Sequence, residues 1–328
     1  MTGTDLDVVA LGNAIVDVLS ESDDNFLDLH GLPKGGMQLI DEGQAKKLYG
    51  DMGPGMEMSG GSAANTMVGV AAMGGKAAFV GRVQGDQLGD VFTHDIRAAG
   101  VSFEPPAPKD GAATARCLVL VTPDAQRTMN TFLGASAELG PDDVDPALIA
   151  RAQVTYLEGY LWDPEPAKAA FRKAMDAAKD AGRKVALTLS DSFCVDRHRT
   201  EFRELVKGPV DILFANEAEI LSLYETDSFD EALAQVQKET HLAVLTRSEK
   251  GCVIVSEGAP TVVSAVKPDV LVDTTGAGDL FAAGFLRGYT AGRDLADCGR
   301  LGAIAAAEII SHYGARPEKD LKELTAGV

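Results

Sequence analysis

A glycine-rich stretch near the C-terminus has the residue types and spacing best suited to chemistry. Residues 273–279 have the sequence DTTGAGD and precede an apolar segment that predicts a helix. Small residues leave backbone amides unshielded at the start of this helix, where free N–H groups and partial positive charge can hold a phosphate. Asp279 lies in the first helical turn, and its carboxylate could accept the proton of a hydroxyl group that attacks phosphorus. The stretch fits phosphoryl transfer, although a plain glycine turn with a capping aspartate would have the same local sequence.

Motifs for other common chemistries are incomplete. Residues 69–76 resemble a phosphate-binding P-loop, but the glycines are one residue too far apart and Ala77 replaces the required Ser or Thr. No GxGxxG follows the first predicted strand, and no GxSxG elbow is present. The five histidines form no pair with metal-ligand spacing. Dinucleotide binding, serine hydrolysis and histidine-based metal chemistry are therefore disfavoured.

The elements that must position residues 273–279 alternate along the chain. Short apolar strands are predicted at 8–12, 154–157, 184–189, 211–214 and 242–246, separated by helical stretches. Such alternation predicts a parallel sheet covered by helices on both faces. Further β-rich pieces lie at 14–40 and 104–135, the second around a turn at 122–126, and we expect them to form a small projecting sheet. A late hairpin is predicted at 253–255 and 261–264.

Composition limits the partners and the compartment. The 328 residues include 30 basic and 49 acidic ones, a net charge of −19, which repels nucleic acid and anionic membrane surfaces. The four cysteines form no CxxC pair, as in a reduced protein. The N-terminus has no signal-peptide pattern, and no stretch reaches the roughly 18 apolar residues of a membrane helix. We therefore expect a cytoplasmic protein with no nucleic-acid or membrane partner.

Residues 273–285 closely resemble the C-terminal motif of the PfkB sugar kinase family, which includes ribokinase, fructokinase and adenosine kinase. The resemblance extends over nearly the whole chain and implies an α/β, ribokinase-like fold. This fold has a three-layer αβα core with a mostly parallel sheet, plus a small β-sheet lid over the substrate site. We expect residues 1–13, 41–103 and 136–328 to form the core, and residues 14–40 and 104–135 to form the lid.

The resemblance also implies roles for the residues around Asp279. In the family the final aspartate of GAGD is the catalytic base, here Asp279, and the preceding amides form an anion hole, here Gly276, Ala277 and Gly278. Residues 60–65 (GGSAAN) resemble the segment that binds the sugar, which implicates Gly61 and Asn65. Residues 12–17 resemble a strand whose aspartate, here Asp17, holds two substrate hydroxyls.

Cofactor sites follow from the same resemblance, which implies ATP and Mg²⁺. Asn216 and Glu219 match the family's NxxE motif, in which Glu219 organises Mg²⁺ through water. Thr246 and Gly251 match a nucleotide-binding loop, although the intervening Arg247 and Ser248 depart from its usual Leu-Gly. Asp273 and Thr275 match positions that bind a monovalent cation such as K⁺ in several members.

The sequence leaves the choice of substrate open. Residues 114–117, 123–129 and 188–193 are similar to segments of the adenosine kinase branch. Met37, Met129 and Phe132 could cover a purine ring, or could simply pack the lid's own core. Glu158 favours a free sugar, because sugar kinases often have a substrate-contacting Glu there.

We therefore expect a kinase that phosphorylates the 5′-hydroxyl of a nucleoside, converting adenosine to AMP. A free-sugar kinase of the ribokinase or fructokinase type is the alternative, and a non-catalytic nucleoside or sugar sensor ranks third. The partner is then a small-molecule nucleoside or sugar. Both a monomer and a homodimer are compatible with the resemblance.

Overall fold

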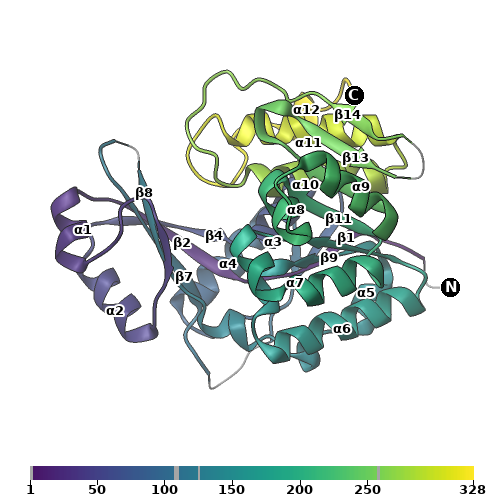
Figure 1. Cartoon of the computed structure of the whole chain (residues 1–328). Helices are drawn as coiled ribbons and strands as arrows, with labels where there is room; N and C mark the ends of the chain where they lie inside the picture. The colour runs from purple at the N-terminus through teal and green to yellow at the C-terminus, as the bar shows by residue number, and fades with distance from the viewer. Residues whose placement is uncertain (1–2, 107–110, 125, 257–258) are drawn as a thin grey trace.

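The computed structural model describes residues 3–106, 111–124, 126–256 and 259–328, and it contains an α/β core beside a smaller sheet (Figure 1). Within these residues the core sheet has nine strands, in the spatial order β14 (Thr261–Val263), β13 (Cys252–Val255), β12 (Leu242–Thr246), β11 (Ile212–Asn216), β10 (Lys184–Thr188), β9 (Ala152–Glu158), β1 (Leu6–Leu11), β5 (Ala77–Val80) and β6 (Ser102–Phe103). Strands from β12 to β6 run parallel, and β13 and β14 pair antiparallel. The carboxyl ends of the parallel strands therefore meet at one edge, where open α/β sheets bind ligands.

Helices cover both faces of this sheet, because successive side chains of a strand point to opposite faces. Val8 and Ala10 of β1 belong to one buried cluster, whereas Val9 and Leu11 belong to another. The first cluster lies under α3 (Ser62–Ala72), α4 (Gln87–Ala98), α10 (Ala277–Thr290), α11 (Leu295–Ile309) and α12 (Leu321–Leu324). The second lies under α5 (Pro146–Arg151), α6 (Glu165–Asp180), α7 (Ser192–Lys207), α8 (Glu217–Tyr224) and α9 (Phe229–Glu239). The expected three-layer core is confirmed.

The smaller sheet, called the lid sheet below, has the strand order β3 (Met37–Leu39), β8 (Arg127–Phe132), β7 (Ala115–Val121), β2 (Ile15–Glu21) and β4 (Gly55–Gly60). Helices α1 (Asp24–His30) and α2 (Glu42–Asp51) cover one face, where Leu27 and Leu48 pack with Val18. Asp17 lies level with Met58 of β4 and Cys117 of β7, and thus on the opposite face. In Figure 1, α1 and α2 lie on the outer side of the lid sheet, so the face with Asp17 turns toward the core.

Aspartate side chains cap the N-termini of helices α2 and α4. Asp41 caps α2 through a capping box with Gln44, and Asp86 caps α4 by accepting the Gly89 amide. The structure differs from the expected boundaries at α2 and β4. Both segments lie in the range 41–103 assigned to the core, but α2 covers the lid sheet and β4 pairs with β2 of that sheet.

A few residues named in the sequence analysis lie outside the described ranges. Residues 107–110 of the expected lid, Ala125 of its turn, and Met1 and Thr2 lie outside the described residues. Within the described ranges, no helix has the length and apolar character needed to cross a membrane. The four cysteines are free and buried.

Candidate active site

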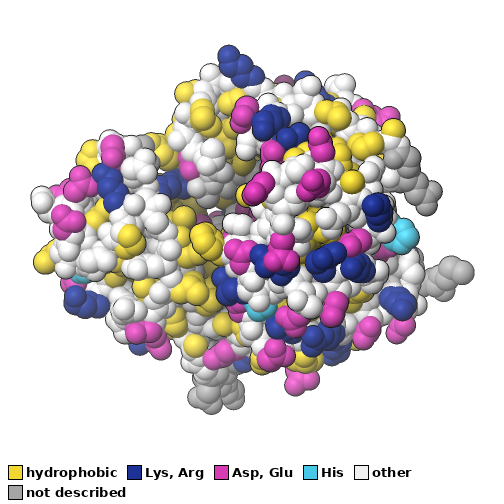
Figure 2. All heavy atoms as spheres, in the orientation of Figure 1, with side chains coloured by type: hydrophobic (Ala, Val, Ile, Leu, Met, Phe, Trp, Pro, Cys, Tyr) yellow, Lys and Arg dark blue, Asp and Glu magenta, His cyan; other side chains and the backbone are white. Residues whose placement is uncertain are grey.

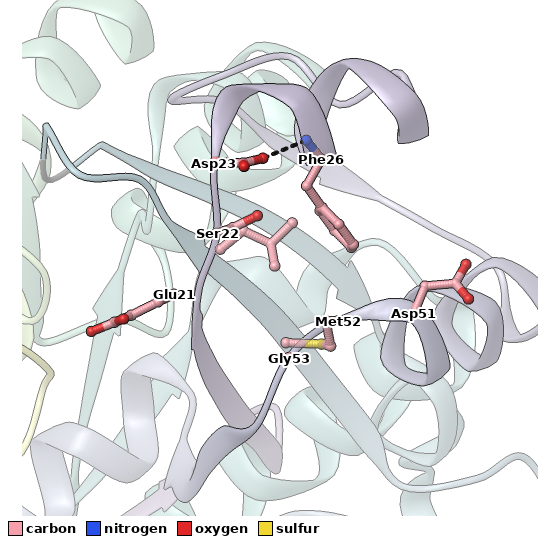
Figure 3. A pocket seen from close by; sticks show the side chains of 8 residues that line it. Glu21, Ser22, Asp23, Phe26, Asp51, Met52 and Gly53 are labelled. Carbon is pink, nitrogen blue, oxygen red and sulfur yellow. Dashed lines mark hydrogen bonds between the residues drawn. The ribbon is translucent and has the colours of Figure 1, made fainter.

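Asp279 lies in the first turn of α10, beside the first turn of α3. Its Oδ1 accepts a hydrogen bond of 2.6 Å from the Ser62 hydroxyl, and its Oδ2 accepts one of 2.9 Å from Asn65 Nδ2. Burial raises the pKa of Asp279 above its usual value, and the two donors together with the Arg316 charge oppose this effect. A carboxylate that is held in place and has a raised pKa is well suited to accept a proton. Figure 2 shows the molecular surface hollowed between the lid sheet and the core.

The start of α10 offers backbone donors and open space. Among the described residues, no group accepts the amide hydrogens of Gly278 or Asp279, whereas the Ala277 amide donates to Thr274 O at 3.2 Å. A Cβ atom built on Gly278 would have no heavy atom within 4 Å. The protein itself therefore leaves room and free N–H groups above this helix end, which is what a phosphate group needs. Of the three amides expected to form the anion hole, that of Ala277 is therefore already hydrogen-bonded within the loop.

Asn65 presents an unused acceptor next to Asp279. Its Nδ2 is committed to Asp279, and its Oδ1 is buried without a hydrogen-bond partner among the described residues. A buried acceptor without a donor costs free energy, so the site is prepared for a donor that the protein does not supply. A substrate hydroxyl would satisfy it.

Asp17 of β2 lies close to two successive glycines, of which Gly60 ends β4 and Gly61 is the N-cap of α3. A Cβ on Gly60 would lie 2.3 Å from Asp17 Oδ2, so the missing side chain gives the carboxylate its place. Gly61 has φ of 92° and caps α3, and a Cβ there would lie 2.2 Å from Asn13 O. Burial raises the pKa of Asp17 to about 6, against the opposing charges of Arg316 and Arg127. The structure thus brings Asp17, Gly61, Asn65 and Asp279 around one region.

Glu158 does not occupy the substrate-contacting position expected for it. It is 1% exposed at the end of β9, and its carboxylate accepts hydrogen bonds from Asn13 N, Asn13 Nδ2 and Ala63 N at 3.3, 2.7 and 2.9 Å. Burial raises its pKa to about 7 in spite of these donors. The carboxylate fixes the first turn of α3 from behind, so its role here is to position that turn.

Phe132 also differs from expectation. Because Cys117 pairs with both Asp17 and Thr131, Phe132 falls on the face of the lid sheet opposite to Asp17. It is buried, and the Arg116 guanidinium lies 5.7 Å from its ring centre. Phe132 therefore packs the lid rather than lining the open face.

The open face of the lid sheet is apolar around Asp17. Met37, Leu39 and Met56 share this face through the strand pairings and are 52%, 60% and 64% exposed. Met58 and Met129 lie on the same face. Such exposed methionines form an adaptable surface that can cover a flat apolar group.

The residues expected to bind nucleotide and Mg²⁺ follow strands β11 and β12 at the carboxyl edge. Asn216 and Glu219 form a capping box at the start of α8, in which the Glu219 carboxylate accepts from Asn216 N and Nδ2 at 2.9 and 2.6 Å. Burial raises the pKa of Glu219 to about 7. Each oxygen can still accept a hydrogen bond from a metal-bound water, so the pair fits Mg²⁺ held through water and not by direct contact.

Thr246 ends β12, and Gly251 closes the loop that follows it. A Cβ on Gly251 would lie 2.1 Å from Val263 O, so glycine is required here by the backbone of β14. The unusual Arg247 forms a bidentate pair with Glu217 and lies 3.7 Å from the Phe229 ring centre. Arg247, which departs from the usual family sequence, therefore has its contacts within the protein.

Asp273 and Thr275 lie in the loop before α10, but the protein already satisfies the Asp273 carboxylate. Its Oδ1 accepts from Thr275 N and Oγ1 at 3.1 and 2.8 Å, and its Oδ2 accepts from Gly314 N at 3.2 Å. Arg127 Nη1 of the lid sheet lies 2.7 Å from the same Oδ2. The arrangement does not fit a monovalent cation bound directly to this carboxylate.

Three residues of the site had no role assigned from the sequence: Ser62, Arg127 and Arg316. Arg316 donates to Ser59 O and Oγ at 2.7 Å each. Burial lowers its pKa to about 10, against the opposing charges of Asp95, Asp17 and Asp279. It places a positive charge among the carboxylates of the site, and no local motif indicates this.

The fold and the site together define a phosphotransferase of the α/β type with a lid. The chain belongs to the pfkB carbohydrate kinase family, whose model, described as "pfkB family carbohydrate kinase", matches residues 56–321. The resemblance seen in the sequence is confirmed. The chain is accordingly an enzyme that transfers a phosphoryl group to an alcohol, and membership of a kinase family implies ATP as the donor.

Some of the proteins that are similar to this chain are named as adenosine kinases, and others are named as sugar kinases or fructokinases. The structure of a probable sugar kinase from Rhizobium etli CFN 42 has 51% identity and a TM-score of 0.92, and the match covers 99% of this chain and 98% of that one. Adenosine kinase from Sinorhizobium meliloti has 51% identity and a TM-score of 0.91, with 98% and 99% covered. Probable fructokinase-3 of Arabidopsis thaliana is 30% identical over 240 residues, which cover 71% of this chain and 69% of that protein.

Proposed function

We propose that this protein transfers the γ-phosphate of ATP to the 5′-hydroxyl of a nucleoside, and that adenosine is its substrate and AMP its product. The observation that carries the proposal is the open apolar face of the lid sheet around Asp17. A free sugar offers hydroxyls to Asp17 but no flat apolar group for Met37, Leu39 and Met56. A nucleoside offers both. The 51% identity to an adenosine kinase over nearly all of both chains supports the same choice.

The proposed mechanism assigns one task to each part of the site. Asp17 accepts hydrogen bonds from the two ribose hydroxyls, since one carboxylate can accept from vicinal donors. Gly61 lets the first turn of α3 come close to the sugar. Asn65 Oδ1 accepts a hydrogen bond from the substrate, and Asp279 takes the proton of the 5′-hydroxyl as it attacks phosphorus.

The start of α10 and the edge of the core sheet complete this mechanism. Of the Gly276–Gly278 amides, those of Gly276 and Gly278 have no acceptor among the described residues, and they stabilise the charge that develops on the transferring phosphate. ATP lies along the core near Thr246 and Gly251. Bound Mg²⁺ would neutralise phosphate charge, with Asn216 and Glu219 holding its water shell. Closure of the lid sheet would exclude water and suppress ATP hydrolysis.

A free-sugar kinase is the second candidate, favoured by the fructokinase relatives. The buried position of Glu158 removes the main sequence argument for it, because that carboxylate is occupied within the protein. We further propose a cytoplasmic enzyme, a setting consistent with four unpaired cysteines. Both a monomer and a homodimer are compatible with the lid sheet, whose edge strands among the described residues are β3 and β4.

The test is an ADP-release assay with ATP and Mg²⁺, comparing adenosine, other nucleosides, ribose and fructose. We expect adenosine to have the highest kcat/KM. Preference for a free sugar over every nucleoside would overturn the substrate and leave the kinase assignment standing. In the same assay Asp279→Asn should lose most turnover while isothermal titration still detects adenosine binding. Substantial turnover by that variant would refute the assignment of Asp279 as base.

A further inference from the structure

The contact between Arg127 and Asp273 joins the lid sheet to the core loop that precedes α10. Arg127 begins β8 of the lid sheet, and Asp273 lies in the core loop that leads into α10. Arg127 Nη1 lies 2.7 Å from Asp273 Oδ2 and 3.1 Å from Thr275 Oγ1. Both side chains are largely buried, with 12% and 9% exposed, so solvent screens the pair only weakly.

Asp273 has no room for another positive partner. Its two oxygens together accept three hydrogen bonds from the protein in addition to the Arg127 contact. The Arg127 guanidinium also lies 5.4 Å from the ring centre of Tyr313, which encloses it further. A monovalent cation at Asp273 and Thr275, as the family resemblance implied, would therefore have to displace Arg127.

We propose that Arg127 is a positioning residue whose guanidinium takes the place of a monovalent cation at Asp273. It neutralises the carboxylate that shapes the loop before α10, and it ties the lid sheet to that loop. A free cation could do the first of these tasks but not the second. The arrangement makes the geometry at the start of α10 depend on where the lid sheet lies.

Charge, and not the shape of the guanidinium, is the decisive property in this proposal. Only Nη1 contacts Asp273 and Thr275, while Nε and Nη2 have no hydrogen-bond partner among the described residues. A lysine ammonium is also a single positive group and could replace Nη1. Arg127→Lys is therefore the matched control for Arg127→Gln, which removes the charge but keeps a polar side chain.

The first test is thermal unfolding in KCl, NaCl or choline chloride at one fixed ionic strength. The wild type and Arg127→Lys should unfold at the same temperature in all three salts. Arg127→Gln should unfold several degrees lower in choline chloride, and KCl should restore much of that loss. Asp273→Asn should show no preference for K⁺, because it no longer has the charge to bind it.

Two kinds of result would contradict the proposal. A wild type that K⁺ stabilises as strongly as it does Arg127→Gln would show that the cation binds beside Arg127. An Arg127→Gln protein that K⁺ does not help, or that fails to fold in every salt, would show that Arg127 does not stand in for a cation. Folding of that variant only in KCl would support the proposal.

Hydrogen exchange tests the connection between the sheets. In saturating KCl the amides of β7 and β8 should exchange faster in Arg127→Gln than in the wild type, because K⁺ restores the charge but not the tie. Equal exchange rates would refute the tie. Neither readout uses a substrate, so both results are independent of whether adenosine is the acceptor.

Discussion

Gly276 and Gly278 are two residues apart, yet the structure needs them for different reasons. Gly276 has φ of 79°, and a Cβ there would lie 2.9 Å from Ala315 Cβ, so both the backbone and the packing require glycine. Gly278 has neither constraint, since a Cβ would meet nothing within 4 Å. We infer that the glycine at 278 leaves space for a ligand that approaches the helix end.

This difference gives a prediction at a single residue. Gly278→Ala should leave the free energy of unfolding unchanged or raise it by roughly 0.4–1 kcal/mol, because alanine restricts the unfolded chain. It should also lower kcat/KM by at least about tenfold, about 1.4 kcal/mol in the barrier, because the methyl group takes the space meant for phosphate. Chemical denaturation and the ADP-release assay measure the two effects.

Gly50 in α2 supplies the control, because its Cβ would also meet nothing within 4 Å but it lies on the outer side of the lid sheet. Gly50→Ala should give the same stability effect with full activity. A Gly278→Ala enzyme as active as Gly50→Ala would argue against a phosphate at this helix end.

Through its motifs the sequence indicated four residues that lie close together in the structure: Asp17, Gly61, Asn65 and Asp279. Their roles in binding and catalysis stay predictions. The sequence could not predict Arg127 or Arg316, because their partners lie 146 to 257 positions away: Asp273, Thr275, Ser59 and Ala64. Glu158 was expected to contact the substrate because sugar kinases often have a glutamate at this position. In the structure its carboxylate is buried and accepts hydrogen bonds from Asn13 and Ala63, which the sequence does not indicate.

At the scale of elements, the ends of β9 and β11 share an unusual property. Glu158 ends β9, and Glu219 lies just after β11, and both are buried carboxylates whose pKa is raised to about 7. Asp17 in β2 has a pKa raised to about 6. The folded state therefore holds protons at these groups that the unfolded chain has already released.

The pH dependence of stability follows from this property. A carboxyl group whose folded pKa is raised contributes stability below its unfolded pKa, and that stability is lost as the pH rises through the folded value. The wild type should therefore become less stable between about pH 5 and about pH 8. Glu219→Gln should make this dependence weaker and remove up to about 3 kcal/mol of the total change in the free energy of unfolding, because glutamine is compatible with the capping box and does not ionise.

Glu217→Gln is the comparison two residues away. Arg247 lowers the pKa of Glu217, so its contribution is present above the unfolded pKa and is lost only at more acidic pH. This variant should keep the wild-type slope from about pH 5 to about pH 8. Urea unfolding at several pH values measures all three proteins, and parallel curves for wild type and Glu219→Gln would contradict the assignment.

The lid sheet shows where prediction of elements from sequence stops. Strands β2, β7 and β8 are rich in β-branched and apolar residues and were expected. Strand β4 has the sequence GMEMSG, with glycine at both ends and no β-branched residue, so nothing local marks it as a strand. It forms because β2 offers it a partner edge, which is a property of the folded molecule.

The whole molecule carries a net charge of −19. Folding brings these negative charges closer together, so their mutual repulsion destabilises the compact state. We expect the unfolding temperature to rise between roughly 10 and 150 mM NaCl, because the screening length falls from about 30 Å to about 8 Å. Choline chloride should give the same rise, since screening does not distinguish these cations. A lower unfolding temperature in salt would mean that surface ion pairs outweigh the repulsion.

The strand order also constrains how the chain can fold as it is synthesised. Strand β1 is the first to appear, but it lies between β5 and β9, and β9 begins only at Ala152. The pairs that hold Asp279 connect residues 214 and 217 positions apart. Pairings this distant must wait for loop closure, and they slow folding. Until the last quarter of the chain leaves the ribosome, the first turn of α3 and the face of the lid sheet lack their counterpart, and their apolar surfaces are open to chaperones and to aggregation.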